Sequence, residues 1–108
     1  MKCINIITTT SSKDEAEKIS NYLIDKRLIA CSQIEEIDSY YIWNDKKENN
    51  KEFRITTKTR KELFIDVYNE IKKIHSYKLP EIISIDIICS KEYENWIYEN
   101  TKGGKLWI

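Results

Sequence analysis

The sequence predicts an α+β fold in which one antiparallel sheet carries two helices on a single face. Apolar, β-branched segments alternate along the chain with segments whose apolar residues recur every three or four positions. Two strand segments follow one another with only a polar stretch between them, which is typical of a hairpin. The 108 residues are enough for one hydrophobic core and too few for two, so we expect a single domain spanning residues 1–108.

The first three predicted elements are a strand, a helix and a long strand. Residues 3–9 are apolar and β-branched and predict a buried strand. A helix should follow over residues 12–26, because Ser12 and Glu15 form the capping-box pattern and the next apolar residues have helical spacing. Residues 29–43 contain almost no turn signal and predict one long strand.

A loop, a second hairpin strand and a second helix come next. Residues 44–51 are polar and charged throughout and predict a loop. Residues 53–58 alternate between apolar and polar, so they should form a strand that pairs with the long strand before it. Thr59 and Glu62 repeat the capping-box pattern, and the apolar stripe that follows runs to Ile74.

The last elements begin after Pro80, which cannot continue a helix. Residues 81–89 alternate in polarity and predict a strand, after which Ser90 should cap a third helix. The glycine pair at 103–104 should end this helix, and residues 105–108 are expected to add a short strand. The order β-α-β-β-α-β, with one further helix, is the ferredoxin-like arrangement.

One face of such a sheet is not covered by its own helices. The last predicted strand nevertheless carries apolar side chains toward both faces. These residues are Ile82 and Ile88 on one side and Ile83, Ile85 and Ile87 on the other. A second apolar face needs a partner, so we expect the chain to assemble through its sheets.

Charge and composition exclude several classes of protein. The 18 basic and 18 acidic residues balance, whereas a protein that binds nucleic acid usually carries a basic excess. No apolar run approaches the roughly 20 residues of a membrane-spanning helix, and no export signal is visible at the N-terminus. Three cysteines without a CxxC pair suit a reducing compartment. We therefore expect a cytoplasmic protein with no nucleic-acid or membrane partner.

Four segments, taken together, resemble the CutA family of divalent-ion tolerance proteins. They are LIAC at 28–31, YIW at 41–43, KTR at 58–60 and HSYKLPEI at 75–82. The segments occur in the family's order and spacing, and the resemblance covers nearly the whole chain. The chain departs from the family's pattern at Asp45 and Ser76, where glycine and proline are common. Thr8 stands where some members carry a cysteine, so a copper site that depends on that cysteine does not carry over.

The resemblance implies a homotrimer of the kind formed by the PII signalling proteins, with long hairpins that pair across subunits. It also implies a non-enzymatic role in tolerance of divalent metals, with Cu(II) or another divalent cation bound and no organic cofactor. The alternative is a PII-like signalling module that binds a small metabolite in the cleft between subunits and presents a loop to a partner protein, which the sequence does not identify.

Two residues are candidate metal ligands. His75 is the only histidine in the chain, and imidazole suits Cu(II). Its alternative role is structural, at the C-terminus of the second helix, where the helix dipole favours a histidine. Cys31 is a candidate soft ligand, and its alternative role is that of a small buried hydrophobe, as for Cys3 and Cys89.

Six residues are candidates for the inter-subunit cleft. Tyr41 and Trp43 lie two apart on one side of the long strand, and they either pack across the hairpin or line a cleft. The full set is Tyr41, Trp43, Glu52, Lys58, Tyr77 and Glu81. An ammonium group and carboxylates around aromatic rings suit a small charged ligand. No nucleophile elbow, phosphate-binding glycine loop or metalloprotease motif is present, so we expect no enzymatic activity.

Overall fold

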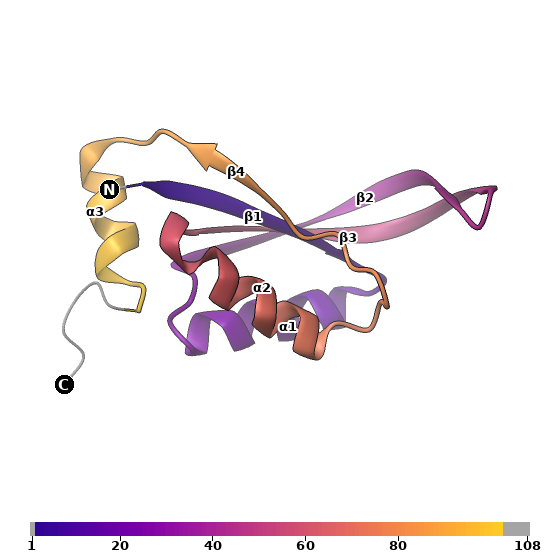
Figure 1. Ribbon diagram of the computed structural model, residues 1–108, viewed down its shortest axis with the longest axis horizontal. Helices are drawn as coiled ribbons and strands as arrows, with labels where there is room; N and C mark the ends of the chain where they lie inside the picture. Colours follow the sequence, from indigo (N-terminus) through magenta and orange to yellow (C-terminus); the bar gives the residue numbers. More distant parts are fainter. Residues whose placement is uncertain (1, 103–108) are drawn as a thin grey trace.

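The computed structural model describes residues 2–102 and has the predicted α+β, ferredoxin-like fold (Figure 1). Its elements are β1 (Cys3–Thr10), α1 (Lys13–Asp25), β2 (Cys31–Trp43), β3 (Lys46–Arg60), a 3-10 turn η1 (Lys61–Leu63), α2 (Phe64–Ile74), β4 (Ile83–Ile87) and α3 (Lys91–Glu99). The strands form one antiparallel sheet in the order β2-β3-β1-β4. The predicted helix end at 103–104 and the predicted strand at 105–108 lie outside the described residues.

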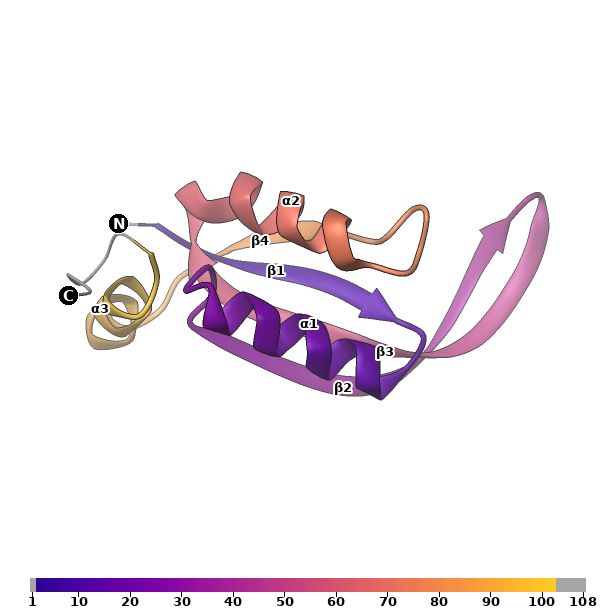
Figure 2. The ribbon, with the colours of Figure 1, turned by 90° about the horizontal axis from the view of Figure 1, so that it is seen from below.

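The hydrophobic core lies between the sheet and the pair of helices α1 and α2, which cover the same face (Figure 2). Alternate residues of the central strands point toward these helices, as the period of a strand requires. The large, fully buried side chains of this core include Ile4, Ile6, Ile19, Leu23, Ile29, Ile55, Val67 and Ile71. Each side chain of this size stabilises the fold by about 1.5–3 kcal/mol when it leaves water.

Two helices begin with the serine caps that the sequence predicts. The Ser12 hydroxyl accepts a hydrogen bond from the Glu15 amide at 3.1 Å, and the Ser90 hydroxyl accepts one from the Tyr93 amide at 3.2 Å. The Glu15 carboxylate does not complete the predicted capping box. It binds the amide and hydroxyl of Ser76 instead, at 2.9 Å each, and so ties α1 to the segment after α2.

The second capping box, predicted from Thr59 and Glu62, is wrong. Thr59 is the penultimate residue of β3 and is fully buried, and its hydroxyl donates to the Leu28 carbonyl oxygen at 2.6 Å. The Glu62 carboxylate contacts Arg60 and Tyr98. Because both side chains have these tertiary partners, the chain enters α2 through η1 with no side-chain cap at either N-terminus.

The loop predicted over residues 44–51 is also wrong, because β3 already begins at Lys46. The turn consists of Asn44 and Asp45 alone, whose φ angles are 51° and 62°, as in a type I′ hairpin turn. Asparagine and aspartate tolerate this left-handed conformation better than most residues. The part of the hairpin beyond the end of β1, residues 37–52, is called here the hairpin arm. It projects well beyond the helices (Figure 2), and the longest dimension of the chain is 48 Å.

The sheet face opposite α1 and α2, called here the open face, is apolar at its β4 edge. The β1–β4 register pairs Ile7 with Ile83 and Asn5 with Ile85, which places these side chains on the open face. Ile83 is 46% exposed and Ile85 is 49% exposed. Strand β4 is shorter than the predicted 81–89, and Ile82 packs against the core. The structure of the single chain therefore confirms the predicted apolar sheet face that the two long helices leave uncovered.

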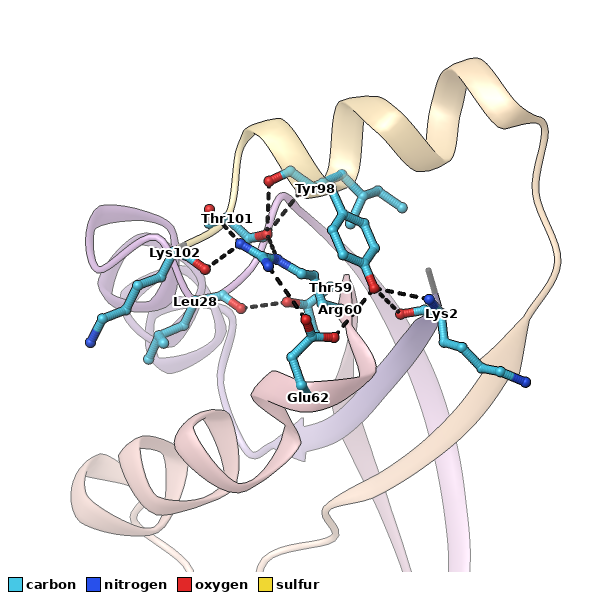
Figure 3. A network of polar contacts seen from close by, with 9 residues as sticks. Lys2, Leu28, Thr59, Arg60, Glu62, Tyr98, Thr101 and Lys102 are labelled. Atoms are coloured by element: carbon cyan, nitrogen blue, oxygen red, sulfur yellow. Dashed lines mark hydrogen bonds and ion pairs between the residues drawn. The ribbon is translucent and has the colours of Figure 1, made fainter. Parts of the chain in front are cut away.

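Helix α3 covers one end of the open face and is held there by Arg60 (Figure 3). The Arg60 side chain is 9% exposed, and its guanidinium donates to the Thr101 hydroxyl at 2.8 Å and to the Thr101 carbonyl oxygen at 3.2 Å. It also donates to the Lys102 carbonyl oxygen. The guanidinium therefore satisfies carbonyl groups just beyond the C-terminus of α3, which have no partner within that helix.

Tyr98 joins the same network to the start of β1 (Figure 3). Its ring lies under the Arg60 guanidinium, 4.7 Å from the guanidinium carbon to the ring centroid. Its hydroxyl accepts from the Lys2 amide at 2.9 Å and lies 3.1 Å from the Lys2 carbonyl oxygen. The network therefore fastens α3 to both β3 and the beginning of β1.

Candidate functional site

A cavity of about 630 Å³ lies along the hairpin arm and reaches the end of β1. Its walls come from the end of β1 and from two further parts of the chain. The strands of the arm contribute Ser39, Tyr41, Trp43 and Glu52, and the segment between α2 and β4 contributes Tyr77 and Glu81. The structure thus brings five of the six predicted cleft residues together around one cavity, here called the arm cleft.

Lys58 is the predicted cleft residue that does not line this cavity. It lies on the same sheet face as Glu52 but six residues further along β3, which is roughly 20 Å for an extended strand. Its ammonium group donates to the Gln33 side-chain oxygen at 2.7 Å and lies 3.9 Å from the Cys31 sulfur. The alternation of residues along β3 places Lys58 on the same sheet face as Glu52, but it does not bring the two side chains to the same point along the strand.

Several residues of the arm cleft were missed by the sequence analysis. Ser39 precedes Tyr41 by two residues, so strand alternation places it on the same side and could have found it. Thr9 and Ser76 also line the cleft. No sequence pattern indicates that either residue lies at the cleft. Thr9 contacts His75 there and Ser76 contacts Glu15, and both are contacts between distant parts of the chain.

A tyrosine and a carboxylate form the best-defined polar contact of the arm cleft. The Tyr77 hydroxyl donates to a Glu52 carboxylate oxygen at 2.7 Å. Burial raises the pKa of Tyr77 well above its usual value, and the hydrogen bond to Glu52 raises that pKa further. This contact joins the segment after α2 to β3 across the cleft.

The side chain of His75 is fully buried, and both of its ring nitrogens have partners within the chain. Nε2 lies 2.8 Å from the Thr9 carbonyl oxygen and therefore donates to it, while Nδ1 accepts from the Tyr77 amide at 3.0 Å. The Glu15 carboxylate lies 3.7 Å from Nδ1. His75 is also the C-cap residue of α2, so it anchors the wall of the cleft that contains Tyr77.

The two candidate metal ligands do not meet within one chain. Cys31 pairs with Lys58 across the hairpin, and Lys58 pairs in turn with Asn5 of β1. His75 binds Thr9, four residues further along β1, or roughly 13 Å away. Within residues 2–102, no group of three or more His, Cys, Asp or Glu side chains is placed to hold a metal ion.

Replacing Tyr77 by phenylalanine should alter the alkaline stability of the protein. A group with a raised pKa in the folded state contributes stability that is complete below its unfolded pKa of 10.0 and is lost as pH rises through the folded value. We expect the free energy of unfolding of wild type to fall above pH 10.0, and to fall less steeply in Tyr77→Phe. Denaturant titrations across this range would measure the two slopes.

Tyr68→Phe makes the same chemical change on a partly exposed ring of α2 and is the control. It should leave the alkaline slope closer to that of wild type than Tyr77→Phe does. Equal slopes for the two variants would show that the contact between Tyr77 and Glu52 has no influence on this pH dependence.

The fold and the arm cleft describe a small α+β protein whose arm and open sheet face extend beyond its own core. Residues 4–100 match the family model described as CutA1 divalent ion tolerance protein. The divalent-cation tolerance protein CutA of Pyrococcus horikoshii is 37% identical over 92% of this chain and 98% of its own length. That of Archaeoglobus fulgidus is 41% identical over 90% of this chain and 96% of its own length.

Solved structures agree with these matches. The crystal structure of CutA1 from Pyrococcus horikoshii has a TM-score of 0.88 at 36% identity, covering 92% of this chain and 98% of that chain. The Archaeoglobus fulgidus structure, described as a periplasmic divalent cation tolerance protein, has a TM-score of 0.91 at 40% identity, covering 93% and 99%. The chain belongs to the CutA1 divalent ion tolerance family, and the resemblance stated from its sequence is confirmed.

Proposed function

We propose that this chain works as a homotrimer that binds a divalent cation and has no enzymatic activity. The observation that carries the proposal is the arm cleft, a cavity along the arm that is lined by two glutamates, Glu52 and Glu81. Membership of the divalent ion tolerance family supports a role in metal tolerance. We propose the cytoplasm as its location, because all three cysteines are free thiols.

The proposal of a trimer rests on two surfaces that one chain leaves uncovered. The open face exposes Ile83 and Ile85, and the arm exposes Tyr40 and Ile42 at 70% and 68%. Such apolar residues, together with long strand edges, are rarely left in water. The number of subunits follows the resemblance to the family, in which three hairpins pair around the assembly.

Among the candidate ligands for a divalent cation, we favour carboxylate oxygens. Glu52 and Glu81 are hard oxygen donors, and the Ser39 hydroxyl lies in the same cleft. These are too few for a complete coordination sphere, so a neighbouring subunit would have to supply further ligands. His75 and Cys31 remain the candidate ligands for Cu(II). His75 would have to exchange an existing hydrogen bond for the ion.

Calorimetric titration of Cu(II) and Zn(II) into the assembled protein tests this proposal. Wild type should bind with a defined stoichiometry, and Glu52→Gln and Glu81→Gln should each bind more weakly, because each loses a charged ligand. Glu17→Gln changes an exposed glutamate of α1 and is the matched control. Unchanged binding in both cleft variants would place the ion elsewhere, and a loss confined to His75→Gln would assign it to the histidine.

The second candidate function is a PII-like signalling module that binds a small metabolite in the same cleft. The aromatic rings of Tyr41, Trp43 and Tyr77 favour it, since binding sites for small molecules combine apolar walls with a few polar groups. The cavity volume also lies in the usual range for such sites. A metabolite that raises the melting temperature of wild type but not of Trp43→Ala, in protein that binds no divalent ion, would favour this function.

The structure also offers support for a non-enzymatic role. The chain has one histidine, and both of its nitrogens contact the backbone. The neighbouring hydroxyl of Ser76 donates to the Glu15 carboxylate at 2.9 Å, not to the imidazole. Nucleophilic catalysis by a serine requires a base within hydrogen-bond reach of the hydroxyl, and this arrangement directs the two groups to different partners.

A further inference from the structure

The arm cleft has aromatic walls and more room than a single metal ion occupies. Its volume of about 630 Å³ lies within the range of about 300–1,000 Å³ that is usual for sites of organic ligands. Tyr41 and Trp43 line it from the arm and are 40% and 47% exposed, and Tyr77 lines it from the segment between α2 and β4. Hard divalent cations take oxygen ligands, so an ion held by the two glutamates would leave all three rings without a role.

Two of these rings are held in position by their own hydroxyl groups. The Tyr77 hydroxyl donates to Glu52 at 2.7 Å, and the Tyr77 ring packs against the His75 ring with 4.9 Å between the centroids. The Tyr41 hydroxyl accepts a hydrogen bond from the side-chain amide of Asn50 on β3. A ligand therefore meets rings whose conformations are already fixed, which lowers the entropic cost of binding.

The polar groups of the cleft favour a positively charged ligand. Two glutamates, Glu52 and Glu81, line the cleft together with one lysine, Lys78. The Glu81 carboxylate has no hydrogen bond or ion pair with any of residues 2–102, so it can accept N–H groups from a ligand. One oxygen of Glu52 accepts from Tyr77, and the other has no partner in the part of the chain that the structure describes.

The electrostatic environment of Tyr77 indicates the same sign of charge. Burial raises the pKa of the Tyr77 hydroxyl above its usual value, and the carboxylates of Glu52 and Glu15 raise it further. Carboxylates that disfavour a phenolate at this point stabilise a cation placed beside it. Lys58, the ammonium group that the sequence predicted for this site, binds Gln33 elsewhere on the sheet and does not offset these charges.

We propose that the arm cleft binds a primary organic ammonium ion whose apolar body packs on the aromatic walls. The inference rests on the second candidate function, because it names the class of metabolite that such a signalling module would take. The ammonium group donates to the carboxylates of Glu52 and Glu81, and the rings of Tyr41 and Trp43 stabilise its charge and bury its apolar body. An anionic ligand would meet the same two carboxylates and a single lysine, Lys78.

Calorimetric titration with three ligands that share a phenyl ring and differ in charge tests this proposal. The ligands are phenethylamine, 2-phenylethanol and phenylacetate, each titrated at neutral pH into the assembled protein with a chelator present to remove divalent ions. Phenethylamine should bind about tenfold more tightly than 2-phenylethanol, because a hydrogen bond to a charged group stabilises a complex more than a neutral one does. Phenylacetate should bind more weakly than either, because its charge is repelled by the two glutamates.

Three variants separate the contributions of charge and of the rings. Glu81→Gln should lower the affinity for phenethylamine about tenfold and leave that for 2-phenylethanol unchanged, because it removes a charge and keeps the shape. Lys78→Gln should raise the affinity for phenethylamine, since it removes a like charge. Trp43→Leu should bring the two affinities closer together, because leucine keeps an apolar wall without a ring. Glu17→Gln on α1 is the matched control and should bind all three ligands as wild type does.

Equal affinities of wild type for phenethylamine and 2-phenylethanol would overturn the proposal, as would undiminished binding of phenethylamine to Glu81→Gln. A preference for phenylacetate would also overturn it, while leaving a module that binds a metabolite in place. If none of the three ligands binds but Cu(II) or Zn(II) does, the ammonium site is wrong and the divalent-cation function stands. If phenethylamine binds as expected and neither metal ion does, the ammonium site stands and the divalent-cation function is wrong.

Discussion

Replacing Ile85 by aspartate should convert the assembled protein into single chains. Ile85 is half-exposed on the open face in one chain, and the proposed trimer would bury it against a neighbour. An aspartate there would place an unpaired charge in an apolar contact in every subunit, which costs several kcal/mol per charge. Sedimentation should give three times the chain mass for wild type and one chain mass for Ile85→Asp.

Ile65→Asp is the control for this experiment. Ile65 is more exposed than Ile85 and lies on α2, away from the open face, so the same substitution there should leave the assembly intact. The melting temperature of wild type should also rise with protein concentration, as mass action requires for a folded oligomer. A wild-type protein that sediments as a single chain at micromolar concentration would contradict the proposed trimer.

Replacing Arg60 by methionine should lower the free energy of unfolding by about 3 kcal/mol. The guanidinium donates to the carbonyl oxygens of Thr101 and Lys102, and methionine keeps much of the side-chain volume without either donor. A buried acceptor left without a partner costs about 1–3 kcal/mol. The stacking contact with the Tyr98 ring would be lost as well. Denaturant unfolding at one fixed protein concentration measures this change.

Arg54→Met is the matched control on the same strand and the same sheet face. Arg54 pairs with Glu35 at 2.9 Å, but both side chains are well exposed, and exposed pairs of this kind contribute about 0.2–1 kcal/mol. The control should therefore unfold nearly as wild type does. If the two variants lost equal stability, the network in Figure 3 would not be the anchor of α3 that its geometry indicates.

The order of the helices and strands could be predicted because each central element buries one face. The spacing of apolar residues in β1 and α1 follows from that burial, since Ile4, Ile6, Ile19 and Leu23 are all buried. The start of β3 carries no such signal. Residues 46–51 are mostly exposed, so a strand can form there without any alternation of apolar and polar side chains. The turn also lacks glycine, which is the usual marker of a tight hairpin.

The spacing of Tyr41 and Trp43 predicted that both lie on one side of β2, but it could not predict that Tyr77 and Glu81 line the same cavity. Sequence position could not show that the Thr9 carbonyl oxygen lies against His75, 66 residues away, or that Glu15 reaches Ser76. The capping-box pattern even assigned Glu15 to a different partner. Local patterns identify which side chains are polar and which face they occupy, and tertiary contacts then decide which of those side chains meet.

The central position of β1 in the sheet has a consequence for how the protein is made. β1 is synthesised first, yet its hydrogen-bonding partners are β3 and β4, and the latter ends at Ile87. The β2–β3 hairpin needs only neighbouring residues and can form within microseconds. The N-terminal strand must wait until most of the chain has left the ribosome, with its apolar side chains exposed in the meantime. Substitutions that make β1 more hydrophobic should therefore lower the yield of native protein in cells before they alter the finished fold.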